Sequence, residues 1–334
     1  MRHGDDMFTI INASRTAQTA LGRWGSAWLT GWTYRKSVTL SRASGAVNNY
    51  QMKLLVGESS GATGEDVDCG GHVLATFNDL RFTTSDGETL LDYWIESISG
   101  ATPNCLATVW IEFDSIGTGA TTFYMYYGKA DAAAVSSGAN TFLFFDDFPG
   151  VAIDTDKWDV TGSGITVGSS VAVLAATSGD KNQRLFSDSA WMVDNETKLR
   201  IKVKSLYLST TGECDFSAMK ADYGTFVAAE FSHRNGASVY WNYTSAVSNN
   251  KSNILGDAAN TWCIIQLRRH ALALWTLNDA NEVSNSTSYP TDAMKVFLRS
   301  DYYTGNQTLS VDWVFVANNR ATEPAWGAWG AEES

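Results

Sequence analysis

The chain has 334 residues, of which 44% are hydrophobic, 12% aromatic and 18% charged, and its formal net charge is −12. This composition excludes a disordered chain, and the negative charge argues against nucleic acid and anionic membranes as partners. No apolar run is long enough for membrane insertion. The length predicts two domains, each large enough to bury its own core.

Residues 1–31 form a mixed leader that contains Gly, Ala and Ser. It lacks the continuous apolar centre of a signal peptide, because Asn12, Ser14 and Arg15 interrupt it. Two explanations fit: the signal was removed, or the protein leaves the cell without one, as virion components do. We expect the leader to be an arm onto a neighbouring subunit or a loose segment.

Apolar and polar residues alternate from Trp32 onward, as they do in half-buried strands, and turn residues separate the alternating segments. Ser85-Asp86-Gly87 predicts a hairpin turn, since Gly readily adopts a positive φ. The strands predicted in the first half cover residues 34–41, 50–56, 80–83, 91–97, 108–113 and 121–127. Such a series is typical of a sandwich.

Residues 128–141, with their Ala-rich stretch, predict a helical turn or linker. We therefore place the domain boundary near residue 140. The predicted organisation is a leader at 1–31, a first sandwich at 32–140 and a second at 141–334. The fold class is all-β, with two consecutive antiparallel β-sandwich (jelly-roll) domains.

Strands are predicted in the second half as well. One of them alternates Leu199, Ile201 and Val203 with basic residues, which predicts one solvated face. Residues 278–281 (NDAN) predict a turn. The predicted strands cover residues 199–204, 225–231, 238–244, 261–268, 271–277, 293–299 and 309–317.

The four cysteines divide equally between the halves, with Cys69 and Cys105 in the first and Cys214 and Cys263 in the second. None has the spacing of a zinc site. One disulfide per domain and four buried thiols both fit, because sequence does not show that two cysteines meet.

Short blocks of the first half resemble one known family. They are residues 32–36 (WTYRK), 78–83 (NDLRFT), 86–87 (DG), 91–96 (LDYWIE), 109–111 (VWI) and 123–128 (FYMYYG). In this order, over about residues 30–148, they resemble the DUF2341 family, a domain of unknown function in archaeal, bacterial and viral surface proteins. The resemblance itself implies no activity.

The ends of the second half carry a further resemblance. They are residues 144–148 (FFDDF), Trp158, 311–316 (VDWVFV) and Glu323-Pro324. These segments resemble the concanavalin A-like lectin/glucanase (LamG-like) jelly rolls. The resemblance implies a two-sheet sandwich, often one that binds sugar.

The lectin/glucanase fold also hosts retaining glycosidases, whose carboxylates lie at positions i, i+2 and i+4 of one strand. The nearest match is Glu213 and Asp215, but the third position is Ser217. Without the second outer carboxylate, a double displacement has no acid. We therefore predict that the chain is not an enzyme and that it requires no cofactor.

Sugar binding needs aromatic rings that stack on pyranose faces, together with polar groups for the hydroxyls. One strand and one late loop offer such groups. The candidates are Tyr240, Trp241, Asn242, Tyr243, Tyr302 and Tyr303. Alternation places one pair of the strand residues in the core, and the alternative for most of these aromatic residues is packing of the sandwich.

Carboxylates flank the first and last strands of the second half, which are often neighbours in a jelly roll. Asp146, Asp147 and Asp312 are candidate ligands of a structural calcium ion. The alternative is that these residues cap turns through backbone hydrogen bonds.

Two binding-type sandwiches predict a surface-exposed structural or binding protein, as a virion tail, fibre or decoration component or an extracellular assembly component. Its expected partners are copies of itself, other particle or surface subunits, or a cell-surface glycan. The alternative is a secreted or envelope-anchored carbohydrate-binding adhesin. The expected location is a virion or the cell surface.

Overall fold

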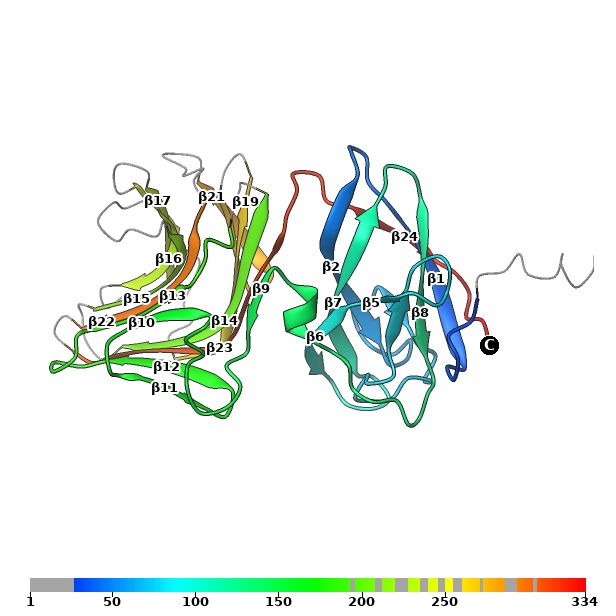
Figure 1. Ribbon diagram of the computed structural model, residues 1–334, viewed down its shortest axis with the longest axis horizontal. Coiled ribbons are helices and arrows are strands. Elements are labelled where there is room, and N and C mark those ends of the chain that lie inside the picture. Colours follow the sequence, from blue (N-terminus) through cyan, green and yellow to red (C-terminus); the bar gives the residue numbers. More distant parts are fainter. Residues whose placement is uncertain are drawn as a thin grey trace, which may run out of the picture.

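The computed structural model describes residues 27–192, 196–207, 212–219, 228–234, 240–245, 250–254, 260–270, 273–285, 293–302 and 305–334. Two β-sandwiches lie side by side along the long axis of the molecule (Figure 1). The predicted all-β fold class is confirmed. Among the described residues, none of the helices combines the length and the apolar character that crossing a membrane needs.

The first sandwich consists of a five-stranded sheet, ordered β24-β1-β8-β4-β5, and a four-stranded sheet, ordered β3-β2-β7-β6. Its strands are β1 (Tyr34–Ser41), β2 (Val47–Gly57), β3 (Val67–Asp68), β4 (Arg81–Thr83), β5 (Leu90–Leu91), β6 (Tyr93–Ser99), β7 (Leu106–Ile116), β8 (Thr121–Tyr127) and β24 (Ala325–Trp329). Alternate residues such as Val38, Leu54, Val109 and Phe123 form one buried core between the sheets.

The hairpin turn predicted between β4 and β5 is confirmed. Gly87 has φ +81°, and its backbone N–H donates to the Thr84 carbonyl over 3.1 Å. The Asp86 carboxylate accepts hydrogen bonds from the backbone N–H groups of Glu88 and Thr89. The hydrogen bond from the Thr89 hydroxyl, followed by these backbone bonds, holds the pKa of Asp86 below its ordinary range.

One helical turn, α2 (Gly138–Thr141), joins the sandwiches, as the Ala-rich linker predicted. The second sandwich pairs a seven-stranded sheet, β10-β13-β22-β15-β16-β17-β18, with an eight-stranded sheet, β11-β12-β23-β14-β19-β20-β21 with β9 beside β23.

The strands of the second sandwich alternate in the same way around a separate buried core. They are β9 (Phe144–Asp146), β10 (Trp158–Thr161), β11 (Ile165–Gly168), β12 (Val171–Ala176), β13 (Asn182–Ser187), β14 (Thr197–Tyr207), β15 (Gly212–Met219), β16 (Ala228–Arg234), β17 (Tyr240–Ser245), β18 (Asn250–Ile254), β19 (Cys263–Arg269), β20 (Ala273–Leu277), β21 (Ala280–Asn285), β22 (Lys295–Tyr302) and β23 (Gln307–Asn318).

The last strand, β24, belongs to the first sandwich, although the sequence analysis assigned it to the second. It runs antiparallel to β1 and is drawn in red beside blue β1 in Figure 1. Trp326 and Trp329 pack against the first core, and Glu333 pairs with Arg35 at 2.8 Å. The first sandwich is therefore completed by two segments with the whole second sandwich between them in sequence.

Residues 319–324, which connect β23 to β24 and which we call the strap, cross from one sandwich to the other. Just before the strap, the backbone N–H of Asn318 donates a hydrogen bond to the Gln51 side-chain oxygen over 3.0 Å. Further along, Arg42 donates to the Thr322 carbonyl over 3.0 Å. The strap is thus held to the first sandwich at the end of β1, and the residue before the strap is held to β2.

An aromatic cluster fills the joint between the sandwiches. It consists of Trp94, Trp110, Phe142, Phe145, Trp313, Phe315 and Ala317, with Ile264 packed against it. Phe142 stacks on Phe315 with ring centroids 3.8 Å apart. These residues come from both sandwiches, so the outer face of the eight-stranded sheet is buried against the first sandwich.

This burial corrects the solvated face predicted for β14. Lys198 and Arg200 lie on the face opposite Leu199 and Ile201, as alternation requires, but both are buried. The first sandwich covers that face, and polar partners replace water. Lys202 remains partly exposed.

The four cysteines lie within described residues, and all are buried thiols with no disulfide between them. The Cys214 sulfur lies 3.8 Å from the Ser300 hydroxyl, and the Cys263 sulfur lies 3.6 Å from the Val203 carbonyl. Of the two alternatives left open by sequence, the structure has the thiols.

Candidate functional site in the cleft between the sandwiches

A two-residue turn between β20 and β21 supplies the first carboxylate of the site. Asn278 and Asp279 have φ values of +51° and +57°, a left-handed pair that suits a tight hairpin and that Asn and Asp tolerate. The Asn278 side chain accepts a hydrogen bond from the backbone N–H of Ile264 over 2.8 Å. The turn is fixed to β19 in this way, and the Asp279 carboxylate is held at the joint.

A bulge in the first sandwich supplies the opposing carboxylate. The register of β6 against β7 shifts between Ile95 and Ser97, so that Glu96 is the extra residue. The Glu96 side chain is 2% exposed, and its Oε2 accepts a hydrogen bond from Trp110 Nε1 over 2.7 Å. This bond leaves Glu96 oriented toward the second sandwich.

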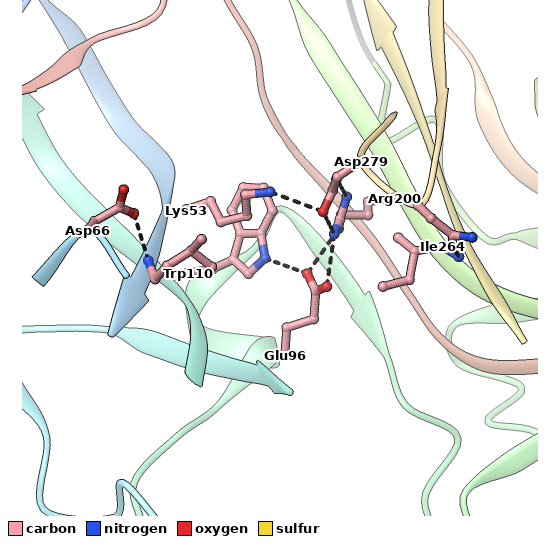
Figure 2. Close-up of polar contacts among 9 residues, drawn as sticks. Lys53, Asp66, Glu96, Trp110, Arg200, Ile264 and Asp279 are labelled. Carbon is pink, nitrogen blue, oxygen red and sulfur yellow. Dashed lines mark hydrogen bonds and ion pairs between the residues drawn. The ribbon is translucent and has the colours of Figure 1, made fainter. Parts of the chain in front are cut away.

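Arg200 of β14 joins these two carboxylates (Figure 2). Its Nε and Nη2 each donate to Glu96 over 2.9 Å. Its Nη1 and Nη2 donate to Asp279 over 2.6 Å and 3.0 Å. Arg200 is 1% exposed, and the planar guanidinium suits such paired bonds. The arrangement fixes the angle between the sandwiches.

The charges of this network shift one another's pKa. Burial alone would raise the pKa of Asp279, but Arg200 and Lys53, whose Nζ lies 3.1 Å away, lower it to about 2. Burial opposes the charge of Arg200, yet the Glu96 and Asp279 carboxylates hold its pKa above the ordinary value. Arg200 and Asp279 are therefore both ionised at neutral pH.

A cleft of about 340 Å³ opens beside this network. Its floor is the outer face of the eight-stranded sheet, its walls are the first sandwich and the strap, and the β20–β21 turn closes one end. The lining side chains are Met52, Lys53, Trp110, Lys198, Gln266, Arg268, Thr276, Asp279, Glu323, Pro324 and Trp326. The volume lies within the range of small-molecule sites, about 300–1,000 Å³.

Lys198 is the most deeply buried cation of the cleft, with its side chain 4% exposed. Its Nζ lies 3.5 Å from Glu323 Oε1, and 5.1 Å and 5.5 Å from the ring centroids of Trp110 and Tyr50. Burial lowers its pKa, nearby Arg268 and Arg200 add to this effect, and Glu323 opposes it. The amine is poised to hydrogen-bond an acceptor in the cleft.

The sequence does not predict the residues of this cleft, because the side chains that meet there lie far apart in the chain. Glu96 and Arg200 are 104 positions apart, and Lys198 and Glu323 are 125 positions apart. The one available signal was the basic alternation along β14, which predicted a solvated face.

The predicted sugar-binding residues occupy the other sheet. Tyr240, Trp241, Asn242 and Tyr243 lie on β17, Tyr302 ends β22, and Tyr303 lies outside the described residues. Two strands separate β17 from β22, which sets them roughly 14 Å apart. The structure does not bring Tyr302 together with the β17 residues.

The register of β17 distinguishes its alternate positions. Tyr240 is in line with His233 on β16, Cys214 on β15 and Ser300 on β22. Because Cys214 and Ser300 are buried, that row belongs to the core side of the sheet. Trp241 and Tyr243 occupy the register positions of the opposite side. They stay a prediction for a glycan surface.

The predicted calcium residues have other partners. Strands β9 and β23 are neighbours, as expected, with Asp146 opposite Val314. The buried Asp146 carboxylate accepts hydrogen bonds from Trp158 Nε1 over 2.6 Å and Phe148 N over 2.9 Å. Asp147 is exposed, and Asp312 pairs with Lys202 at 2.6 Å.

These contacts are those of the alternative, in which the acids support turns and strand ends. Among the described residues, no group of three or more His, Cys, Asp or Glu side chains is arranged to hold a metal ion. Calcium binding by Asp146, Asp147 and Asp312 stays a prediction.

The strand with the partial glycosidase pattern is β15. Glu213, Asp215 and Ser217 stand opposite Asp301, Arg299 and Phe297 of β22. On the other side, Ser217 stands opposite Glu230 of β16. The spacing of carboxylates along a single strand does not reveal Glu230, because it lies on the neighbouring strand and sequence does not show which residues pair across strands.

Residues 76–161 match the family model described as a domain of unknown function, DUF2341. The resemblance to this family is confirmed for these residues, which include strands β4 to β9. The match passes the joint and reaches β10. Among curated proteins, no sequence matches the chain.

Several solved structures resemble about half of the chain. An endo-acting O-glycanase from a study of mucin breakdown by the human gut microbiota has a TM-score of 0.46 and 14% identity, over 54% of this chain and 100% of its own. The Bacillus licheniformis β-glucanase has a TM-score of 0.43 and 13% identity, over 53% of this chain and 98% of its own. A family 16 glycosyl hydrolase of Mycobacterium smegmatis has a TM-score of 0.41 and 19% identity, over 52% of this chain and 99% of its own.

These structures correct one prediction. From the sequence we predict that the chain is not an enzyme, because Ser217 replaces a carboxylate. The solved structures that it resembles are glycoside hydrolases, and Glu230 stands opposite Ser217 in the register. We therefore withdraw the prediction. A likeness of this kind concerns the fold and assigns no activity to this chain.

Proposed function

We propose that the protein recognises glycans and that the cleft between the sandwiches is a glycan-binding site. The carrying observation is the composition of this cleft: Trp110 and Trp326 stand beside charged and amide side chains from both sandwiches. Sugars need an aromatic surface for their apolar faces and polar groups for their hydroxyls. The jelly-roll architecture of the second sandwich supports the same proposal.

The joint makes such a site rigid. Arg200, Glu96 and Asp279 hold the sandwiches together beside the cleft, and the aromatic cluster packs behind them. A rigid site binds with little ordering cost, because its side chains are held before the ligand arrives.

A glycan array with the whole chain tests glycan recognition. The variant Trp326→Ala tests whether the glycan binds in the cleft. We expect binding to at least one glycan, weakened about tenfold or more in the variant because it loses aromatic surface. The matched control is Trp329→Ala. Trp329 packs on the same core from the same strand but does not line the cleft.

Two outcomes would count against the proposal. Binding of no glycan by the wild-type chain would contradict glycan recognition. Binding that Trp241→Ala abolishes and Trp326→Ala leaves intact would move the site from the cleft to β17.

Self-assembly on a virion or cell surface, the other function predicted from sequence, stays a prediction. Size-exclusion chromatography with light scattering tests it, and a strict monomer would count against it.

A further inference from the structure

The cleft gathers cationic side chains in a chain whose net charge is negative. Lys53, Lys198 and Arg268 line it with Asp279 and Glu323, so the lining carries one more cation than carboxylates. The chain as a whole has a net charge of −12. Lys53 is paired with Asp279 and Arg268 with Glu282, so Lys198, whose contact with Glu323 is long, is the cation most open to an anionic ligand.

Lys198 is positioned to receive the anion. An ammonium group has three donors, and within the described residues the Lys198 amine pairs with one oxygen, Glu323 Oε1, at 3.5 Å. Its other surroundings are the rings of Trp110 and Tyr50, which offer no strong acceptor. A buried ammonium with a single distant carboxylate favours a further anionic oxygen.

Glu323 occupies the place that a ligand carboxylate would take. It lies on the strap, its side chain is 42% exposed, and its contact with Lys198 is long. Because water reaches the Glu323 end of this pair and the contact is long, Glu323 is readily displaced into water. The strap thus carries an internal competitor for the anion.

The cleft also offers groups for a sugar ring. The Thr276 hydroxyl is buried against the cleft and has no hydrogen-bond partner among the described residues. Thr276 stands opposite Gln266 in the register of β19 and β20, so a hydroxyl and an amide are adjacent on the floor. Trp326, partly exposed, forms the facing wall.

We propose that the cleft is specific for acidic sugars, in which a uronate carboxylate displaces Glu323 and pairs with Lys198. The inference rests on the proposed function, because it names the class of glycan that the same site takes. The ring hydroxyls bind at Thr276 and Gln266, and Trp326 contacts the ring.

The test is calorimetric titration of the whole chain with oligosaccharides of glucuronate, galacturonate and mannuronate, each compared with its neutral methyl ester. We expect at least one acid to bind about tenfold or more tightly than its ester, and this ratio to fall with added salt. Glu323→Gln should raise the affinity for the acid severalfold and leave the ester unchanged. Glu323 is exposed, so this variant does not threaten the fold.

Two further variants complete the test. Lys198→Gln should make acid and ester bind alike, whereas Glu88→Gln, an exposed change outside the cleft, should alter neither. Equal binding of acids and esters by the wild-type chain would overturn the inference while leaving glycan recognition intact. An acid preference that Glu323→Gln does not increase would overturn the displacement of Glu323. Binding of neither acids nor esters, together with an empty glycan array, would overturn the proposed function itself.

Discussion

Arg200 of the second sandwich and Glu96 of the first form a two-pronged ion pair across the joint, with two N–O distances of 2.9 Å and both side chains almost fully buried. The pair follows from a bulge that frees Glu96 and from the alternation that sets Arg200 on the outer face of β14. This ion pair and the aromatic cluster together hold the two sandwiches in their relative position.

Replacing Arg200 with Met should destabilise the joint. Glu96 would be left buried without its cation, which costs about 3–5 kcal/mol. We expect the wild type to unfold in one calorimetric transition and Arg200→Met to unfold in two. Lys202→Met is the matched control, since Lys202 lies two positions along β14 and is partly exposed, so that a loss below about 1 kcal/mol is expected. A single transition at unchanged temperature in Arg200→Met would contradict the role of the pair.

Asp279 should make the protein sensitive to acid. Its pKa is about 2 in the folded chain against an ordinary value of 3.8, so the folded state favours the carboxylate. The stability from this shift is complete above about pH 4 and is lost as the pH falls toward about 2. Denaturant titrations at several pH values should show a shallower acid-side loss in Asp279→Asn than in the wild type. Parallel curves for the two proteins would show that Asp279 is not a source of the loss.

Glu112 on β7 should have the opposite effect. Burial, and then the neighbouring Asp92 and Asp114, raise its pKa to about 7 from an ordinary value of 4.5. The folded state therefore favours the protonated acid, and the free energy of unfolding should fall as the pH rises between these values. Glu112→Gln removes this dependence and should be more stable than the wild type at about pH 8.

The measurement for Glu112 is the midpoint of thermal unfolding between about pH 5 and pH 8, with Glu88→Gln as an exposed control. The wild type and the control should lose stability across this range in parallel, while Glu112→Gln changes less. A Glu112→Gln midpoint that follows the wild type throughout would contradict the shifted pKa.

Removal of β24 should unfold part of the first sandwich. A chain that ends at residue 320 lacks Trp326 and Trp329, which pack on the first core. Replacing a core Trp by Ala typically lowers the free energy of unfolding by about 3–5 kcal/mol, and we expect a loss of this order here. The truncated chain also lacks Glu332, which accepts a hydrogen bond from Tyr127 over 2.7 Å. We expect the truncated chain to begin unfolding at a lower temperature in calorimetry, and a synthetic peptide of residues 321–334 to restore the wild-type temperature. An unfolding temperature unaffected by the truncation would show that β24 is dispensable.

The alternation of apolar and polar residues determined the strands of this protein, since every second side chain of a strand meets the core. The Asn278-Asp279 turn was also readable, because few residues tolerate two successive left-handed conformations. The blocks around Trp94 and Tyr126 were enough to indicate the DUF2341 resemblance. These are local properties, and a local pattern suffices to predict them.

Only the tertiary structure decided what covers each face. Periodicity shows that Arg200 lies opposite Ile201, but it does not distinguish a face in water from one buried against another domain. Glu96, Asp279 and Arg200 meet because two sandwiches dock, and β24 returns to β1 across the whole second sandwich. Such contacts depend on docking free energies summed over many residues, so no short segment of sequence carries them.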